Sequence, residues 1–265
     1  MRGFVWHEAD SPLHHLNPLT KLALSVPVAV VVALATEPLT PLALMLAALV
    51  ATRLLGHVPW LSLLRPLGFS ALLGVGMFWT GVTFYAGPGS EPGAPSLALG
   101  PLAIPHAALV YGLTMAARLW AIFAASMLFV LTTDPVAFVL SLIHQARLPY
   151  RIGYGVFAAY RFVPLVGEEL ANIRAAHGVR DVGGRTGPLD RLRRTFGYAI
   201  PLLAISVRRA ERVALAMDSR AFGALPTRTY YRTTSAGRAD LVFAVGALAL
   251  IAAIVAAVGM LASTT

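Results

Sequence analysis

The stretch "DLVFAVGALALIAAIVAAVGMLA", residues 240–262, carries one charge, Asp240, at its first position. A helix that crosses the hydrocarbon core of a membrane needs about 20 largely apolar residues. This stretch therefore predicts a transmembrane helix. Four further stretches satisfy the same criterion, at about residues 19–36, 39–55, 67–86 and 106–131.

The composition of the whole chain agrees with a membrane protein. Of its 265 residues, 57% are hydrophobic and 12% are charged, and the mean hydropathy is +0.72. A soluble domain usually carries about 25% charged residues. The predicted class is an all-α integral membrane protein with about five transmembrane helices. The chain has no cysteine, which excludes disulfides, thiol catalysis and cysteine metal sites, and its N-terminus lacks a signal-peptide pattern.

Basic residues predict the orientation of the chain in the membrane. Sixteen of the 21 Lys and Arg residues lie between positions 147 and 238, and none lies in 36–41, in 87–105 or after the last span. The positive-inside rule then places the N-terminus and residues 133–239 in the cytoplasm and the C-terminus outside. The net charge of +9 is explained by these inner segments, so nucleic acid is not an expected partner. The Gly- and Pro-rich loop 87–105 is expected to be external and irregular.

Segment 133–239 differs from the four spans before it, in 1–132, and from the span in 240–265, because charges interrupt its apolar stretches. Helical periodicity predicts amphipathic helices at about 161–180 and 199–220, lying at the cytoplasmic membrane surface. Glu168 and Glu169 are each expected to form a solvent-exposed ion pair with Arg161 or Arg174. The predicted apolar strips are Phe162, Val166, Leu170, Ile173 and His177 on the first helix, and Leu203, Val207, Ala210, Ala214 and Met217 on the second.

Both amphipathic helices end on an arginine among mostly small residues, "AAHGVRD" at Arg180 and "AMDSRAFG" at Arg220. A cation at a helix C-terminus is favoured by the helix dipole. Small neighbours would also let a partner surface approach and receive the guanidinium. The repetition of the pattern favours a partner contact.

The order of these features resembles a known family, the transmembrane T component of energy-coupling factor (ECF) transporters, or EcfT/CbiQ family. "DSPLHHLNPLTK", residues 10–21, is similar to its N-terminal motif, and 112–135 to its arginine-bearing span with a Thr-rich end. Residues 146–181 are similar to its run of Pro, an apolar stretch, Arg-Phe-x-Pro and acidic residues. The two arginine ends resemble the family's paired Ala-Arg-Gly motifs, although neither tripeptide is Ala-Arg-Gly.

The resemblance implies a non-catalytic coupling subunit with two kinds of partner. It would sit on two ABC-type ATPase subunits, which bind the ATP and Mg, and would itself bind no cofactor, metal or solute. It would also hold a small membrane protein, the S component, which captures a vitamin or a transition-metal ion in the bacterial cytoplasmic membrane. The implied ATPase-coupling residues are Val179, Arg180, Asp181, Ser219, Arg220 and Ala221.

Arg118 lies in the middle of the span 106–131, where a charge costs at least about 2.5–3.5 kcal/mol and must face protein. It is expected either to bond carbonyls or hydroxyls of another helix or to act where the S component moves. His7, Glu8, His14 and His15 lack an established metal-ligand spacing.

Two other classes of protein stay open. A self-sufficient permease would need polar residues in several spans and often has an internal repeat, and neither is found. A membrane-embedded enzyme acting on lipid head groups would need convergent Asp, His or Ser side chains, whereas the twelve acidic residues here are scattered.

Overall fold

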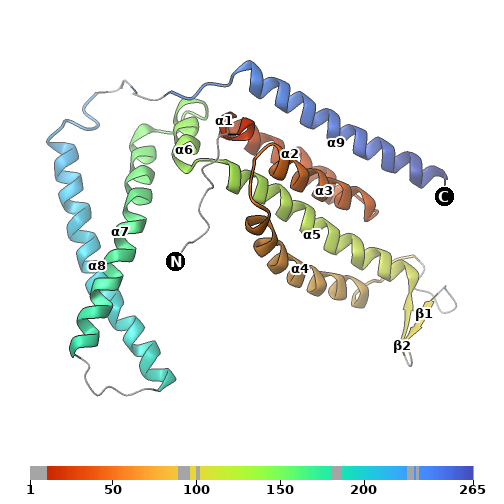
Figure 1. Ribbon diagram of the computed structural model, residues 1–265, viewed down its shortest axis with the longest axis horizontal. Helices are drawn as coiled ribbons and strands as arrows, with labels where there is room; N and C mark the ends of the chain where they lie inside the picture. The colour runs from red at the N-terminus through yellow and green to blue at the C-terminus, as the bar shows by residue number, and fades with distance from the viewer. Residues whose placement is uncertain are drawn as a thin grey trace. The chain divides into compact units, whose positions relative to one another are not determined.

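The computed structural model describes residues 11–88, 96–99, 102–180, 187–225, 230 and 233–264. These residues form an all-α fold with one small hairpin (Figure 1). The helices are α1 (Pro12–His15), α2 (Pro18–Leu34), α3 (Leu39–Leu54), α4 (Trp60–Thr83), α5 (His106–Thr132), α6 (Pro135–His144), α7 (Tyr150–Arg180), α8 (Pro188–Asp218) and α9 (Arg238–Thr264). The strands are β1 (Ser96–Leu99) and β2 (Leu102–Pro105).

A helix stands at each of the five predicted spans. Among the described helices, α4, α5 and α9 are long and apolar enough to cross a membrane. Helices α2 and α3 are apolar but have only 17 and 16 residues. At 1.5 Å per residue they are about 25 Å long, a few ångströms short of a typical hydrocarbon core. The three long helices are therefore the firm candidates for spans.

The chain divides into two compact units, one of Met1–Ser141 with Thr234–Thr265 and one of Leu142–Thr233. In the first unit α5 lies between α4 and the pair α2 and α3, and α9 packs against α2 and α3 (Figure 1). The second unit is built on the pair α7 and α8, which contact each other.

Glycines allow α4 and α5 to approach closely. A Cβ on Gly81 would lie 2.8 Å from the Cα of Gly112, and a Cβ on Gly112 would lie 2.7 Å from the Phe78 carbonyl oxygen. The indole of Trp120 occupies the space beside Gly74 and donates from Nε1 to the Ser70 carbonyl oxygen at 3.1 Å. Small residues of this kind let helices pack closely where lipid supplies no hydrophobic driving force.

Two sequence expectations need correction. The loop 87–105 was expected to be irregular, but its end forms the antiparallel strands β1 and β2, with Ser96 opposite Pro105. Short apolar runs on both sides of a Gly-Pro pair supply the pairing segments. The two amphipathic helices begin about eleven residues earlier than predicted, because α7 and α8 tolerate the internal prolines Pro164 and Pro201.

Candidate functional site

The contact between α7 and α8 is apolar at its centre. Phe162 and Val166 of α7 face Leu202 and Ile205 of α8, around a cavity of about 70 Å³. Further along α7, Ile173 is buried, and the ring of His177 meets that of Tyr198 in α8, with centroids 5.1 Å apart. The predicted strip of α7 thus includes Phe162, Val166 and His177, which contact α8.

The predicted strip of α8 meets this contact only at Ala210, which lines the same cavity. The strip that faces α7 is Tyr198, Leu202, Ile205 and Arg209, spaced four, three and four residues apart. Leu203 and Val207, on the predicted strip, are 64% and 54% exposed. Phe196 and Ile200 continue this strip toward the start of α8 and are exposed too. We call Phe196, Ile200, Leu203 and Val207 the outer stripe of α8.

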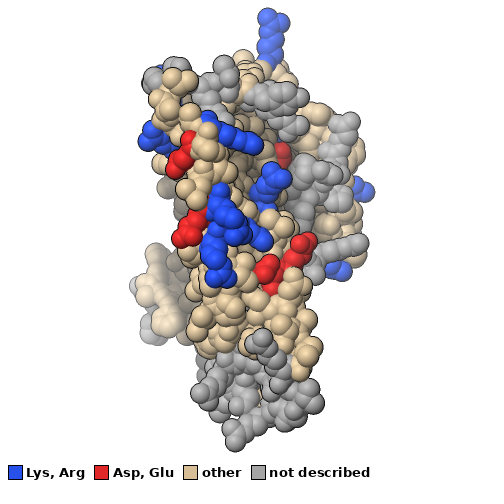
Figure 2. Space-filling model, turned by 90° about the vertical axis from the view of Figure 1, so that its left-hand side faces the viewer, with Lys and Arg blue, Asp and Glu red and all other residues tan. Residues whose placement is uncertain are grey.

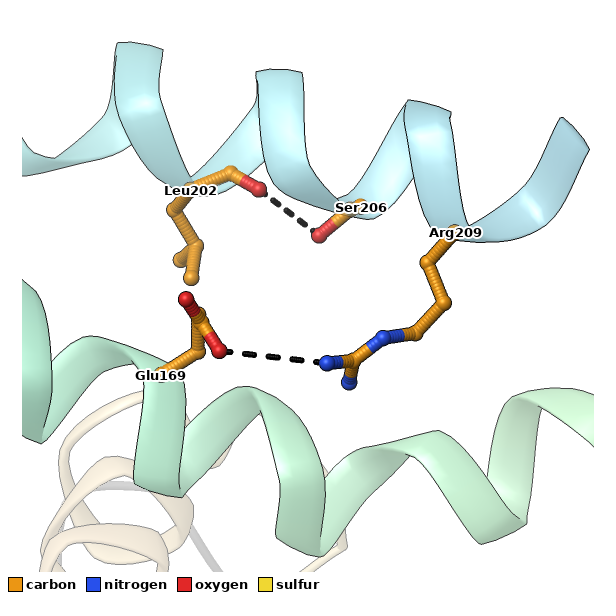
Figure 3. A network of polar contacts seen from close by, with 4 residues as sticks. All are labelled: Glu169, Leu202, Ser206 and Arg209. Atoms are coloured by element: carbon orange, nitrogen blue, oxygen red, sulfur yellow. Dashed lines mark hydrogen bonds and ion pairs between the residues drawn. The ribbon is translucent and has the colours of Figure 1, made fainter. Parts of the chain in front are cut away.

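A weak polar link supports the α7–α8 contact (Figure 3). The Arg209 guanidinium of α8 lies 3.8 Å from the Glu169 carboxylate of α7. Beside it, within α8, Ser206 Oγ donates to the Leu202 carbonyl oxygen at 2.8 Å. The sequence predicted an ion pair of Glu169 within its own helix, α7. The ion pair that the structure records for Glu169 is with Arg209 of α8. Both side chains remain more than a quarter exposed, so the ion pair contributes at most about 1 kcal/mol.

Charged side chains gather on the surface of the second unit. Figure 2 looks from the side on which α7 and α8 are drawn, and Lys and Arg side chains lie in the middle of that face with carboxylates beside them. Neither α7 nor α8 is among the helices apolar enough to cross a membrane. A surface with this many charges needs water or a partner protein rather than lipid.

The end of α8 is a defined C-cap that presents Arg220. The Phe222 N–H donates to the Met217 carbonyl oxygen at 3.0 Å, and the Ala221 N–H donates to that of Asp218 at 2.9 Å. This pair of hydrogen bonds is the Schellman motif, in which the residue after the cap adopts a left-handed conformation. That residue is Ala221, with φ +55°.

The start of α7 holds this turn in place. Arg151 Nη2 donates to the Gly223 carbonyl oxygen at 2.8 Å, and the Tyr150 hydroxyl donates to that of Leu225 at 3.2 Å. The ring of Phe222 packs edge-on against those of Tyr150 and Tyr154. The backbone around Arg220 is therefore tied to a second helix.

The Arg220 side chain itself is accessible to solvent. It is exposed, as are its neighbours Ser219 and Ala221, and the structure records no hydrogen bond or ion pair for it among the described residues. At the other arginine end, α7 stops at Arg180 and Val179 is exposed, while Asp181 lies outside the described residues.

The two arginine ends lie at opposite ends of the α7–α8 pair. The start of α7 contacts the turn after α8 through Arg151 and Gly223, whereas the end of α7 contacts the early part of α8 through His177 and Tyr198. The helices are therefore antiparallel, and each has 31 residues, a length of about 45 Å. A single small surface cannot contact both arginines (Figure 1).

Arg118 bonds the end of another helix in the first unit. Its Nη2 donates to the carbonyl oxygen of Ala35, the C-cap of α2, at 2.6 Å. Its Nε is buried, with no acceptor among the described residues. A cation suits a helix C-terminus, where carbonyl groups lack partners within the helix. This contact is the bond to a carbonyl of another helix that the sequence predicted as one possibility. A role of Arg118 where the S component moves stays a prediction.

We expect Arg118→Leu to insert but to lower the stability of the purified chain by about 1–3 kcal/mol, because the Ala35 carbonyl loses a charged donor. The midpoint of thermal unfolding in detergent measures the effect. Arg118→Lys, which retains a cation, should lose less. An Arg118→Leu chain that melts like the parent would show that the bond is dispensable.

Sequence reasoning missed a buried polar cluster that joins α2, α5 and α9. Asp240 accepts hydrogen bonds from the backbone N–H groups of Asn17 at 2.6 Å and of Gly237 at 2.7 Å. Lys21 Nζ donates to the carbonyl oxygen of Thr132, the last residue of α5, at 2.8 Å. The motif "LNPLTK" was a signal for Asn17 and Lys21, but nothing in the sequence pointed to partners 223 and 111 residues away.

No cluster of three or more His, Cys, Asp or Glu side chains that could hold a metal ion occurs in the described part of the chain. His7 and Glu8 lie outside the described residues. His14 contacts Ser11, with Nδ1 2.6 Å from Oγ, just before α2.

Comparison with known proteins identifies the family. The family model CbiQ, described as "Cobalt transport protein", matches residues 9–231, which include α1 to α8 and the Arg220 turn. The chain belongs to the CbiQ family. As a CbiQ-family chain with apolar helices long enough to span a bilayer, it is a membrane component of a transport system.

Curated relatives of this CbiQ-family chain carry related names. The energy-coupling factor transporter transmembrane protein EcfT of Heliobacterium modesticaldum is 32% identical over 84% of both chains. The EcfT protein of Limosilactobacillus fermentum is 30% identical over 87% of both. A putative ABC transporter ATP-binding protein of Bifidobacterium longum is 28% identical over 62% of this chain, but the match covers only 22% of that protein.

The C-cap at Ala221 gives a physical reason for the third position of the family's Ala-Arg-Gly motif. A left-handed conformation costs an L-residue about 1–2 kcal/mol, whereas glycine adopts it freely. We therefore expect Ala221→Gly to raise the stability of the second unit by about 0.5–1 kcal/mol, measured as a rise in the unfolding midpoint. The same change inside α8, Ala214→Gly, should lower it. A fall for Ala221→Gly would contradict the C-cap geometry.

Proposed function

We propose that this chain is the coupling subunit of an ECF-type ABC importer. The observation that carries the proposal is the exposed Arg220, whose side chain has no recorded partner in the described part of the chain, on a turn tied to α7. The second arginine end, Arg180, is at the opposite end of the same helix pair. In this proposal each arginine, with its flanking residues, enters a surface of a different ATPase subunit. The α7–α8 pair then transmits the movement of the ATPases.

The partners of the arginine ends are proposed to be two ABC-type ATPase subunits. A stretch similar to this chain occurs inside a protein named as an ABC transporter ATP-binding protein, which supports an association between the two activities. ATP and Mg would bind to the ATPase subunits, and this chain would bind neither. Its role in ATP hydrolysis would be mechanical, through a desolvated guanidinium contact.

The third partner is proposed to be a small membrane S component that captures a vitamin or a transition-metal ion. The outer stripe of α8 supports this, since exposed apolar side chains at helical spacing suit an apolar partner surface. In this proposal the S component selects the solute, and this chain does not.

Reconstitution with defined partners tests the proposal. The chain is produced with two ATPase subunits and an S component, or with either omitted, and both co-purification and ATP-dependent uptake of the S component's solute are measured. We expect a stable complex and uptake only with all partners present. Uptake by the chain alone would support a permease, and lipid turnover by the chain alone would support a lipid-modifying enzyme.

The orientation is proposed to be N-terminus inside and C-terminus outside, from the distribution of basic residues. Because the chain has no cysteine, single cysteines can report the side of the membrane. Ser263→Cys should react with an impermeant thiol reagent in intact cells, and Thr186→Cys should react only after the cells are opened. The reverse pattern would overturn the orientation.

A further inference from the structure

The first unit contains an open apolar groove of about 300 Å³, the size of a small ligand pocket. Its walls come from α2, α3, α5 and α9, and they are lined by small or aliphatic residues such as Ala47, Gly246 and Ala247. One charged side chain lines it, that of Lys21 in the first turn of α2.

The ammonium of Lys21 has fewer hydrogen-bond acceptors than it has N–H donors. The side chain is 3% exposed, and among the described residues the one recorded acceptor is the Thr132 carbonyl oxygen, although an ammonium has three N–H donors. Asp240 lies close enough to attract this charge, but the hydrogen bonds recorded for its oxygens come from Asn17 and Gly237, and the described residues show no ion pair between the two side chains. A buried cation in this state favours an additional anionic ligand.

Lys21 also marks the level of a membrane interface. It lies in the first turn of α2, it bonds the last residue of α5, and Asp240 in the first turn of α9 bonds Asn17. Three helix ends therefore meet at one edge of the unit. Where helices enter a bilayer, such an edge lies at the depth of the lipid head groups.

The length of the groove matches one leaflet. Its lining on α9 runs from Phe243 to Ile254 along a single helix face, a rise of about 16 Å. Half of a hydrocarbon core of about 30 Å is about 15 Å. A groove of this length that starts beside a buried cation has the dimensions of one acyl chain below a phosphate.

We propose that this groove binds an anionic glycerophospholipid, with one acyl chain between α2, α3 and α9 and the phosphate at Lys21. The charge of Lys21 selects the anionic head group, and the small residues of the groove leave room for the chain. The site is independent of the coupling role proposed above, because its residues lie in the first unit.

Native mass spectrometry of the full chain tests the site with palmitoyl-oleoyl phosphatidylglycerol and phosphatidylcholine, two lipids with identical acyl chains. We expect the parent to bind the first phosphatidylglycerol about fivefold more tightly than phosphatidylcholine, the preference that one cation gives for an anionic lipid near a membrane surface. Lys21→Gln, which can still donate to Thr132, should abolish the preference.

Gly246→Leu should fill the groove and weaken binding of both lipids by about tenfold. A Cβ at Gly246 meets nothing within 4 Å, so the helix accepts the side chain. The matched control is Gly259→Leu, on the same helix, equally unobstructed and outside the groove lining, which should bind like the parent.

Equal binding of the two lipids by the parent, or a preference that survives Lys21→Gln, would overturn the proposal. So would a Gly246→Leu chain that binds both lipids like the parent, since the lipids would then lie elsewhere on the surface. If Lys21→Gln does not fold, two results still test the proposal. They are the preference of the parent for phosphatidylglycerol and the comparison of Gly246→Leu with Gly259→Leu.

Discussion

Replacing Arg180 and Arg220 together by alanine is expected to weaken association with the ATPase subunits by a factor of at least about a thousand and to abolish solute uptake. Truncating one partner of a desolvated charged contact costs about 2–5 kcal/mol, and two such losses at separate sites add. The sites are separate because α7 and α8 are antiparallel and each arginine ends a different helix. Each single variant should therefore retain partial assembly.

ATPase pull-down and solute uptake in the same strains measure the effect. Arg208→Ala removes an exposed arginine from the middle of α8 and should behave like the parent. Lysine at position 180 or 220 should rescue only partly, because an ammonium cannot make the forked hydrogen bonds of a guanidinium. If the double alanine variant assembles and transports normally, both residues are ordinary helix-end charges.

The outer stripe of α8 leads to the second large effect. Leu203→Glu with Val207→Glu should abolish binding of the small membrane partner and leave ATPase binding intact, because two carboxylates would be buried without partners in an apolar interface. Both positions are exposed in the chain by itself and face away from α7, so the fold should persist. Co-purification of each partner separately measures the two effects.

The control for this charge change is Ala204→Glu, one residue further along α8. Ala204 is exposed and is four residues from Arg208, so a glutamate there gains a favourable neighbour. It should leave both partners bound. A double glutamate variant that keeps the membrane partner would show that the outer stripe is not its binding surface.

Local patterns were sufficient for the helical membrane architecture. Each predicted span coincides with a helix to within a few residues, apart from the start of α4. The reason is that a long run of apolar residues by itself favours a helix in lipid. The family was also accessible from sequence, since the motifs at 10–21, 112–135 and 146–181 lie in the range that the family model matches. The C-terminal position of Arg180 and Arg220 followed from the end of helical periodicity.

Tertiary structure decided which surfaces meet. Helix α8 has two apolar strips, and its periodicity could not tell that Leu202 and Ile205 face α7 while Leu203 and Val207 stay open. The choice depends on the shape of a second helix, which no local pattern contains. For the same reason, the bond of Asn17 with Asp240 and the groove at Lys21 emerged only when residues far apart in sequence were brought together.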